Sequence, residues 1–96
     1  MSIAFEDIAR QLQIPPERLV RQSVLAYISH EERLARSDVS DLADRYGVGT
    51  AQELRDAVAR GEVYSHPAWE DSIEWENLEA YLTRLSELRA RLGTDV

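Results

Sequence analysis

Residues 16–46, PERLVRQSVLAYISHEERLARSDVSDLADRY, decide the fold of this chain. Apolar side chains recur at helical spacing along the whole segment, and Gly47 follows where a helix commonly ends in the left-handed conformation. Pro16 suits the first turn of a helix, because a missing N–H costs nothing there. The segment therefore predicts a long central helix. Ser37 and Asp38 compete for backbone hydrogen bonds, which leaves open whether residues 16–46 are one helix or two.

A short helix is predicted before this segment, over residues 3–12. Ser2 can cap it, and Glu6 and Asp7 are favourable near the positive end of its dipole. The segment 13–16, QIPP, ends it, because proline cannot donate to a continuing helix and disfavours helical backbone in the residue before it.

A second short helix is predicted after the central one. Thr50 and Glu53 form a capping box, in which the Thr50 hydroxyl accepts from the third amide of the helix while Glu53 reaches back to the Thr50 amide. The helix should run through Arg60 and stop at Gly61. It is too short to be stable alone, so we expect it to dock on the central helix.

The last helix is predicted to begin near His66 and Pro67. From there its apolar positions change to alternating steps of three and four, which is the spacing of a heptad seam. The members of this seam, and the predicted oligomerisation residues, are Leu78, Tyr81, Leu85, Leu88 and Leu92. A seam of about two heptads is expected to pack in an antiparallel hairpin or in a dimer.

The fold class that follows is all-α: a helical hairpin with one long central helix, a short docked helix and a long C-terminal helix. Residues 1–61 form an N-terminal helical part and residues 62–96 an acidic, aromatic C-terminal helix, within a single compact domain. A chain of 96 residues without cysteine supports only a modest core, so we expect a homodimer.

The stretch 62–79, EVYSHPAWEDSIEWENLE, has six carboxylates and no Lys or Arg, so it holds −6 of the net charge of −7. Acidic residues interleaved with large apolar ones are unsuited to a self-contained core face and suited to a surface that a basic partner covers. Trp69 and Trp75 lie six residues apart, about 120° from sharing one helix face, so at most one should enter the core. The predicted partner-binding residues are Trp69, Glu70, Asp71, Glu74 and Trp75.

The composition argues against several other functions. A pI near 4.7 is unfavourable for broad nucleic-acid binding. The longest apolar run is Val24 to Ile28, far below the roughly 18 residues of a membrane span, and the N-terminus resembles no export signal, so we expect a soluble, cytoplasmic protein. With two histidines and no Gly-rich loop, we expect no catalytic residue, metal, cofactor or small-molecule substrate. His66 and Glu70 alone are too few for a metal site.

Residues 5–28 match the spacing of a helix-turn-helix motif. Ile8 and Ala9, Leu12, Ile14 and then Leu19 occupy its packing positions, although Gln13 replaces the usual turn glycine and the second helix is unusually long. If the motif were functional, the exposed side chains at the DNA would be Arg18, Arg21 and Gln22, with Arg10 on the backbone. The alternative is an ordinary helical hairpin whose arginines pair with neighbouring acids.

The order of motifs resembles a group of short prokaryotic proteins that are taken as antitoxins of two-gene toxin–antitoxin modules. The resemblance rests on 46–48 (YGV), 50–54 (TAQEL), 61–63 (GEV) and 66–71 (HPAWED), with 75–79 (WENLE) after them. It implies a non-enzymatic regulator that neutralises a basic, nuclease-like toxin through the acidic segment. The alternatives are a DNA-binding transcriptional regulator and a structural helical homodimer or adaptor.

Overall fold

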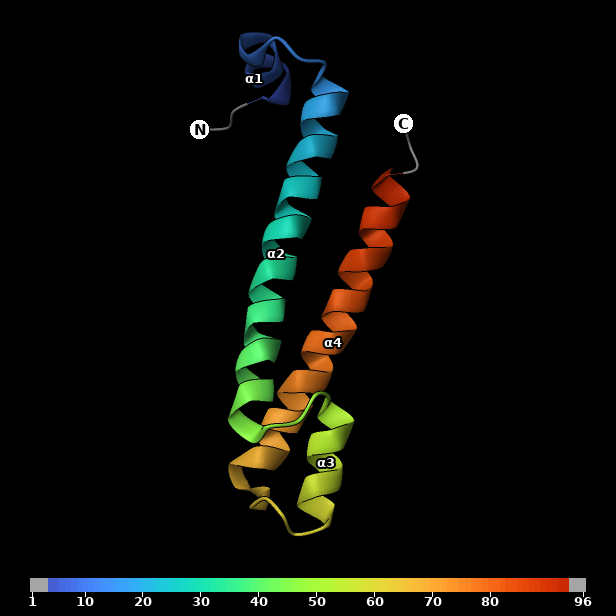
Figure 1. Ribbon diagram of the computed structural model, residues 1–96. Helices are drawn as coiled ribbons and strands as arrows, with labels where there is room; N and C mark the ends of the chain where they lie inside the picture. The colour runs from blue at the N-terminus through green and yellow to red at the C-terminus, as the bar shows by residue number, and fades with distance from the viewer. Residues whose placement is uncertain (1–3, 94–96) are drawn as a thin grey trace.

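The computed structural model describes residues 4–93, and within that range the chain forms four helices: α1 (Phe5–Leu12), α2 (Pro16–Tyr46), α3 (Ala51–Ala59) and α4 (Ser65–Gly93). α2 and α4 run antiparallel, and α3 lies at the end where the chain passes from one to the other (Figure 1). α1 packs on α2 at the opposite end. The predicted all-α hairpin with a long central helix, a short docked helix and a long C-terminal helix is confirmed. The short helix α3, however, packs mainly on α4 and not on the central helix α2, which corrects the predicted docking partner.

The central segment is one helix of 31 residues, so the question left open at Ser37 and Asp38 is resolved. Both side chains are exposed, and α2 continues through them. The helix begins with Pro16 in its first turn, as predicted. It ends with Gly47 at φ 67°, whose N–H donates to the Ala43 carbonyl at 2.8 Å.

The turn between α1 and α2 depends on Gln13. This residue has φ 62° and ψ 41°, which is the left-handed conformation that glycine usually supplies. The Ile14 N–H donates to the Ala9 carbonyl at 3.0 Å, and the Gln13 N–H donates to the Arg10 carbonyl at 3.2 Å, so the C-terminus of α1 is capped. At the other end α1 starts at Phe5 rather than at residue 3, and the predicted cap Ser2 lies outside the described residues.

One of the two hydrogen bonds predicted for the capping box at α3 is present. Thr50 Oγ1 accepts from the Glu53 N–H at 3.1 Å. Glu53 Oε2, however, accepts from the Gly49 N–H at 2.7 Å and not from the Thr50 amide, because the extended backbone at Thr50 brings the preceding amide within reach. The helix ends at Ala59, where Gly61 has φ 76° and closes the C-terminus.

α4 has its regular turns after Pro67. His66 is extended, with φ −121° and ψ 123°, as expected of a residue that precedes proline. The predicted start of the last helix near His66 and Pro67 is therefore confirmed.

The core lies where the end of α2, all of α3 and the first turns of α4 meet. Its buried cluster consists of Leu42, Ala51, Leu54, Ala68 and Trp75. The prediction that residues 62–79 do not form a core face was wrong. Ala68, Ser72 and Trp75 follow steps of four and three, which places them on one face of α4. The two small residues leave room for close helix packing, and Trp75 fills the space beside them.

The rest of the hairpin packs through four of the five residues of the predicted seam. Leu85 is buried against α2, while Leu78, Tyr81 and Leu92 are half-buried, as is Leu82 between them. Leu88 is exposed and so does not pack within the hairpin, whereas Arg89 lies inward and bonds to α2. The first of the two predicted packings, the antiparallel hairpin, is the one present within the chain.

The domain is elongated rather than compact, contrary to the prediction. Its principal extents are 60 × 31 × 17 Å, and its radius of gyration is 19.2 Å. A compact domain of this length would have a radius of gyration of about 12–13 Å. The cause is α2, because an unbroken helix of this length spans about 46 Å and reaches far beyond the core.

We call residues 37–79 the core end, and residues 4–36 together with 80–93 the arm. The core end contains the last turns of α2, all of α3 and the first half of α4. The arm contains α1, the rest of α2 and the second half of α4. The two parts differ in packing, in charge and in the apolar side chains that they expose.

Candidate functional site

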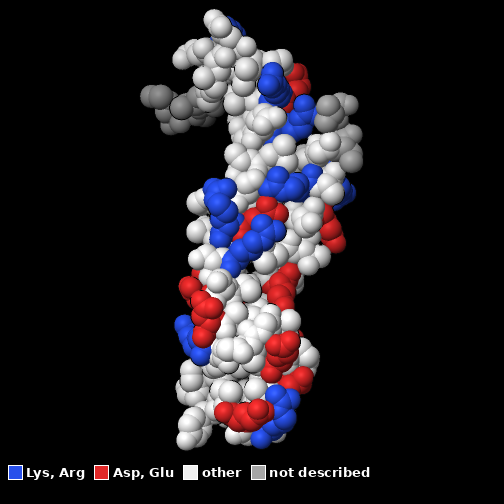
Figure 2. Space-filling model, viewed as in Figure 1, with Lys and Arg blue, Asp and Glu red and all other residues white. Residues whose placement is uncertain are grey.

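The core end and the arm have opposite net charge. The core end has eleven carboxylates against three arginines, or −8, whereas the arm has eight arginines against six carboxylates, or +2. On the face drawn in Figure 2, the blue side chains lie mostly over the upper and middle parts and the red ones mostly toward the lower end. The negative field of the protein is therefore concentrated at the core end.

Trp69 is a large, half-exposed apolar side chain on that acidic part. It is 48% exposed. The Arg55 guanidinium of α3 lies over its ring at 5.3 Å from the centroid, and Arg55 Nη2 also donates to Glu76 Oε2 at 2.5 Å. Because Arg55 is held by Glu76 and stacked on the ring, the indole is fixed in place without being covered.

Ile73 and two carboxylates adjoin Trp69 on α4. Ile73 is 41% exposed and stands one turn after Trp69, on the same side of the helix. Glu70 and Glu74 are exposed and form a neighbouring row with the same spacing. We call Trp69, Glu70, Ile73 and Glu74 the acidic-aromatic surface. Three of the five predicted partner-binding residues belong to it.

Neighbouring groups stabilise the ionised form of the Glu70 carboxylate. Its pKa is lowered, first by a hydrogen bond from its own backbone N–H and then by His66, whose Nδ1 lies 3.0 Å from Glu70 Oε1. Glu70 therefore stays ionised at neutral pH. No group of three or more His, Cys, Asp or Glu that could hold a metal occurs among residues 4–93.

Asp71 has an internal role. It accepts from the Tyr46 hydroxyl and from Arg45 Nη1, the latter at 2.9 Å, and so joins the last turn of α2 to α4. Burial and this carboxylate raise the pKa of Tyr46, and the hydrogen bond to Asp71 raises that of Arg45. Because the Asp71 side chain is mostly covered, it is a poorer candidate for partner contact than the sequence suggested.

Trp75 does not belong to the surface. It has no exposed area, which corrects its prediction as a partner-binding residue. The expectation that only one tryptophan enters the core is confirmed. The small residues Ser72 and Ala68, one and two turns earlier on the same face, are the signal that could have identified Trp75 as the buried one.

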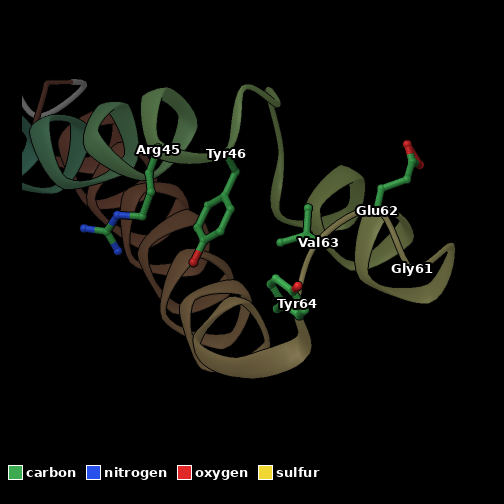
Figure 3. Close-up of a pocket in the computed structure, with 6 residues that line it drawn as sticks. All are labelled: Arg45, Tyr46, Gly61, Glu62, Val63 and Tyr64. Atoms are coloured by element: carbon green, nitrogen blue, oxygen red, sulfur yellow. The ribbon is translucent and has the colours of Figure 1, made fainter.

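The core end also has a hollow of about 500 Å³ that the sequence did not predict. It is lined by Arg45, Tyr46, Gly61, Glu62, Val63 and Tyr64. In Figure 3, Arg45 and Tyr46 project from the end of α2, Val63 and Tyr64 come from the connection that follows α3, and Glu62 turns away. The two groups lie far apart in sequence, and only the turn at Gly61 brings the connection back to α2.

The predicted DNA-binding residues are not equally placed. Arg18 and Gln22 are exposed one turn apart on α2. Arg10 is exposed and pairs with Asp7 at 3.3 Å. Arg21 was predicted to be exposed as well, but it is half-buried, because it stands two turns before the buried Ile28 on the side of α2 that faces α4. The left-handed turn at Gln13 has the geometry that a helix-turn-helix requires of its turn residue.

Comparisons with known proteins identify a family and no activity. The model of the family described as "Uncharacterized protein MJ0235 family" matches residues 1–92, so the chain belongs to that family. No curated protein and no solved structure matches it significantly. None of the helices in residues 4–93 is long and apolar enough to cross a membrane. The resemblance to antitoxins is not tested by these comparisons and stays a prediction.

Proposed function

We propose that this protein is a non-enzymatic, protein-binding regulator whose acidic-aromatic surface covers a basic protein partner. The observation that carries the proposal is the net charge of −8 at the core end together with half-exposed Trp69 and Ile73 in its midst. Complementary charge speeds encounter and disfavours wrong partners. Large apolar side chains at the centre of such a surface supply most of the binding free energy.

Trp69 is the anchor of this surface. Its ring is stacked under Arg55, which is tied to Glu76, so the indole has little freedom left to lose on binding. A side chain that is already ordered in its bound position saves part of the entropic cost of association. Glu70 and Glu74, beside it, would meet lysines or arginines of the partner.

The chemistry of this surface fits an antitoxin acting in the cytoplasm. A nuclease that binds RNA needs a basic surface to neutralise phosphates. An acidic surface with apolar anchors would occupy that same basic surface and exclude nucleic acid. The step from a basic protein to a nuclease-like toxin rests on the sequence resemblance described above.

The test is affinity capture of partners from the native host with a tagged chain, followed by identification of the proteins bound. We expect one basic protein that the wild type retains and that Trp69→Ala or Glu70→Lys/Glu74→Lys loses. The matched control is Glu6→Lys/Glu17→Lys, because it makes the same charge change at two exposed positions of the arm. Equal capture by the acidic-surface variants and the control would contradict the proposal.

DNA binding is a second candidate with one observation in its favour: Arg18 and Gln22 are exposed just after the left-handed turn at Gln13. The charge is less favourable, because residues 4–36 contain five arginines and five carboxylates. A gel shift on the DNA upstream of the gene at two salt concentrations tests it. A regulator should give a salt-sensitive band that Arg18→Ala/Gln22→Ala abolishes.

A further inference from the structure

The arm exposes an apolar row along α2. Val20, Val24, Tyr27 and Leu34 are between 40% and 61% exposed, and with Glu31 they follow steps of four, three, four and three. This spacing places all five on one face of the helix. Seven of the ten large apolar side chains that are exposed in the described residues belong to the arm, so this row is not an isolated feature.

The row is distinct from the face by which α2 packs on α4. That face contains Ile28, Glu32 and Ala35, which are buried. Each stands one residue after a member of the row, and one residue turns an α-helix by about 100°. α2 therefore has two neighbouring faces with apolar side chains in the arm, and α4 covers only one of them.

Side chains of α4 lie beside this exposed row of α2 and widen it. The Tyr81 hydroxyl donates to Glu31 Oε1 at 2.6 Å, so Tyr81 adjoins the row. Leu88 stands two turns after Tyr81 on the same face of α4 and is exposed. We call Val20, Val24, Tyr27, Leu34 and Leu88 the arm stripe.

The arm has only one layer of helices to bury this surface. The smallest extent of the molecule is 17 Å. This is little more than the diameter of one helix with its side chains, about 10–12 Å. Stable domains bury the apolar faces of their helices between at least two packed layers. The arm stripe faces out of the layer, in the place where a second layer would pack.

We propose that the arm stripe binds a second copy of this chain in an antiparallel arrangement, which forms a four-helix bundle around a two-fold axis near Tyr27. A two-fold axis pairs a surface with itself, so the surface must not repel its own copy. The arm stripe meets this condition, because the one carboxylate within its α2 row, Glu31, stands four residues from Tyr27, so its two copies lie about 12 Å apart along the antiparallel helices.

Charge selects the antiparallel direction. A parallel dimer would place two core ends, each with a net charge of −8, side by side. In the antiparallel dimer they lie at opposite ends of the assembly. Asp38 and Asp41, which continue the α2 row, would then approach the N-terminal end of the partner's α2, where the helix dipole favours negative charge.

The area available is sufficient for a stable contact. Residues 16–38 span about 33 Å of α2, and residues 80–93 span about 21 Å of α4. At about 10 Å of width for each helix, each copy offers about 540 Å². The total of about 1,100 Å² exceeds the roughly 1,000 Å² that a specific protein interface needs. Both acidic-aromatic surfaces would remain outside this contact, so the dimer could hold two partners. The inference is independent of the proposed function.

The first experiment measures molar mass by light scattering at protein concentrations up to about 100 µM, which is above the micromolar Kd of weak protein interfaces. We expect a dimer for the wild type, and a helical monomer for Val24→Glu and for Tyr27→Glu. The matched control is Ile73→Glu, which should stay dimeric, because Ile73 at 41% is as exposed as Val24 at 40% but lies in the core end. A wild type that stays monomeric throughout, or glutamate variants that stay dimeric, would overturn the proposal.

The second experiment does not require the glutamate variants to fold. The chain has no cysteine, so single cysteines can be introduced and oxidised. Tyr27→Cys, on the two-fold axis, should form a disulfide-linked dimer. Val20→Cys should not, because an antiparallel pairing separates the two copies of that position by about 21 Å along the axis. Cross-linking at both positions would indicate a parallel dimer and overturn the proposal, as would cross-linking at neither.

Discussion

The two ends of the same helical hairpin are stabilised by different means. At the core end three helices meet, and Leu54 and Trp75 are fully buried between them. In the arm, the buried apolar side chains of the α2–α4 contact include Ile28, Ala35 and Leu85, none of which is as large as Trp75. The charged Glu32 is buried among them. The difference teaches that one long helix can cross from a packed core into a region where its own chain supplies too few partners.

Polar contacts take the place of apolar volume in the arm. Arg89 Nη2 donates to Glu32 Oε1 and to Ser29 Oγ, both at 2.6 Å. Such directional bonds fix how α4 is aligned along α2, whereas they add little net stability compared with buried apolar area. The core end should therefore determine most of the stability, and the arm should tolerate change.

The largest expected effect is at Trp75. Trp75→Ala should lower the free energy of unfolding by about 3–5 kcal/mol, because it leaves a cavity among three helices. Trp69→Ala should cost less than about 1 kcal/mol, because Trp69 is half-exposed and leaves no enclosed cavity. Urea denaturation followed by circular dichroism measures both. Equal losses from the two substitutions would contradict the difference in their burial.

The next effect is at the contact that joins α2 to α4 within the core end. Asp71→Ala should cost about 1–3 kcal/mol, because it leaves the Tyr46 hydroxyl without its acceptor in a partly buried place. The control is Asp7→Ala, which removes the exposed ion pair with Arg10 and should change stability by less than about 0.5 kcal/mol. A loss from Asp7→Ala as large as that from Asp71→Ala would show that ion pairs matter equally at both ends.

Local rules predicted the helices well from sequence. Gly47, Pro16 and the Thr50 cap act within one turn of the chain, so the residue types themselves determine where helices begin and end. The ends of the segment 16–46 followed from these rules, whereas its continuity through Ser37 and Asp38 did not. The helix ends depend on no contact between distant residues.

The candidate site was predicted only in part, because burial depends on which helix lies opposite. Residues 62–79 are both acidic and rich in large apolar side chains, and the pattern alone did not separate Trp69 from Trp75. Docking of α3 on one face of α4 made that separation. The hollow at Tyr46 and Tyr64 arises where the turn at Gly61 brings the connection after α3 back to α2, and it had no signal in the sequence.

Lowered pH should weaken the arm through Glu32. Its pKa is lowered from the ordinary 4.5, chiefly by the hydrogen bond from Arg89. A lowered pKa in the folded state contributes stability above the unfolded value, and this contribution is lost as the pH falls below 4.5 and through the folded value. Glu32→Gln should be less stable than the wild type at pH 7, by less than Asp71→Ala because an acceptor for Arg89 remains. The gap should close as the pH falls, and a gap that is constant from pH 7 to pH 3 would contradict this origin.

The smallest effect tests the turn that attaches α1 to the arm. Gln13 has a left-handed backbone that costs an ordinary side chain energy and glycine almost none, so Gln13→Gly should stabilise the protein by about 0.5–1 kcal/mol. The reverse change, Gly47→Ala, should destabilise it by about 1 kcal/mol. Nothing lies within 4 Å of a Cβ added at Gly47, so that cost would come from the backbone alone. Thermal unfolding of the two variants measures both changes in stability. If α1 contributes to the cooperative unit, the two shifts in Tm should have opposite signs, whereas no shift for Gln13→Gly would mean that α1 unfolds separately from the rest of the hairpin.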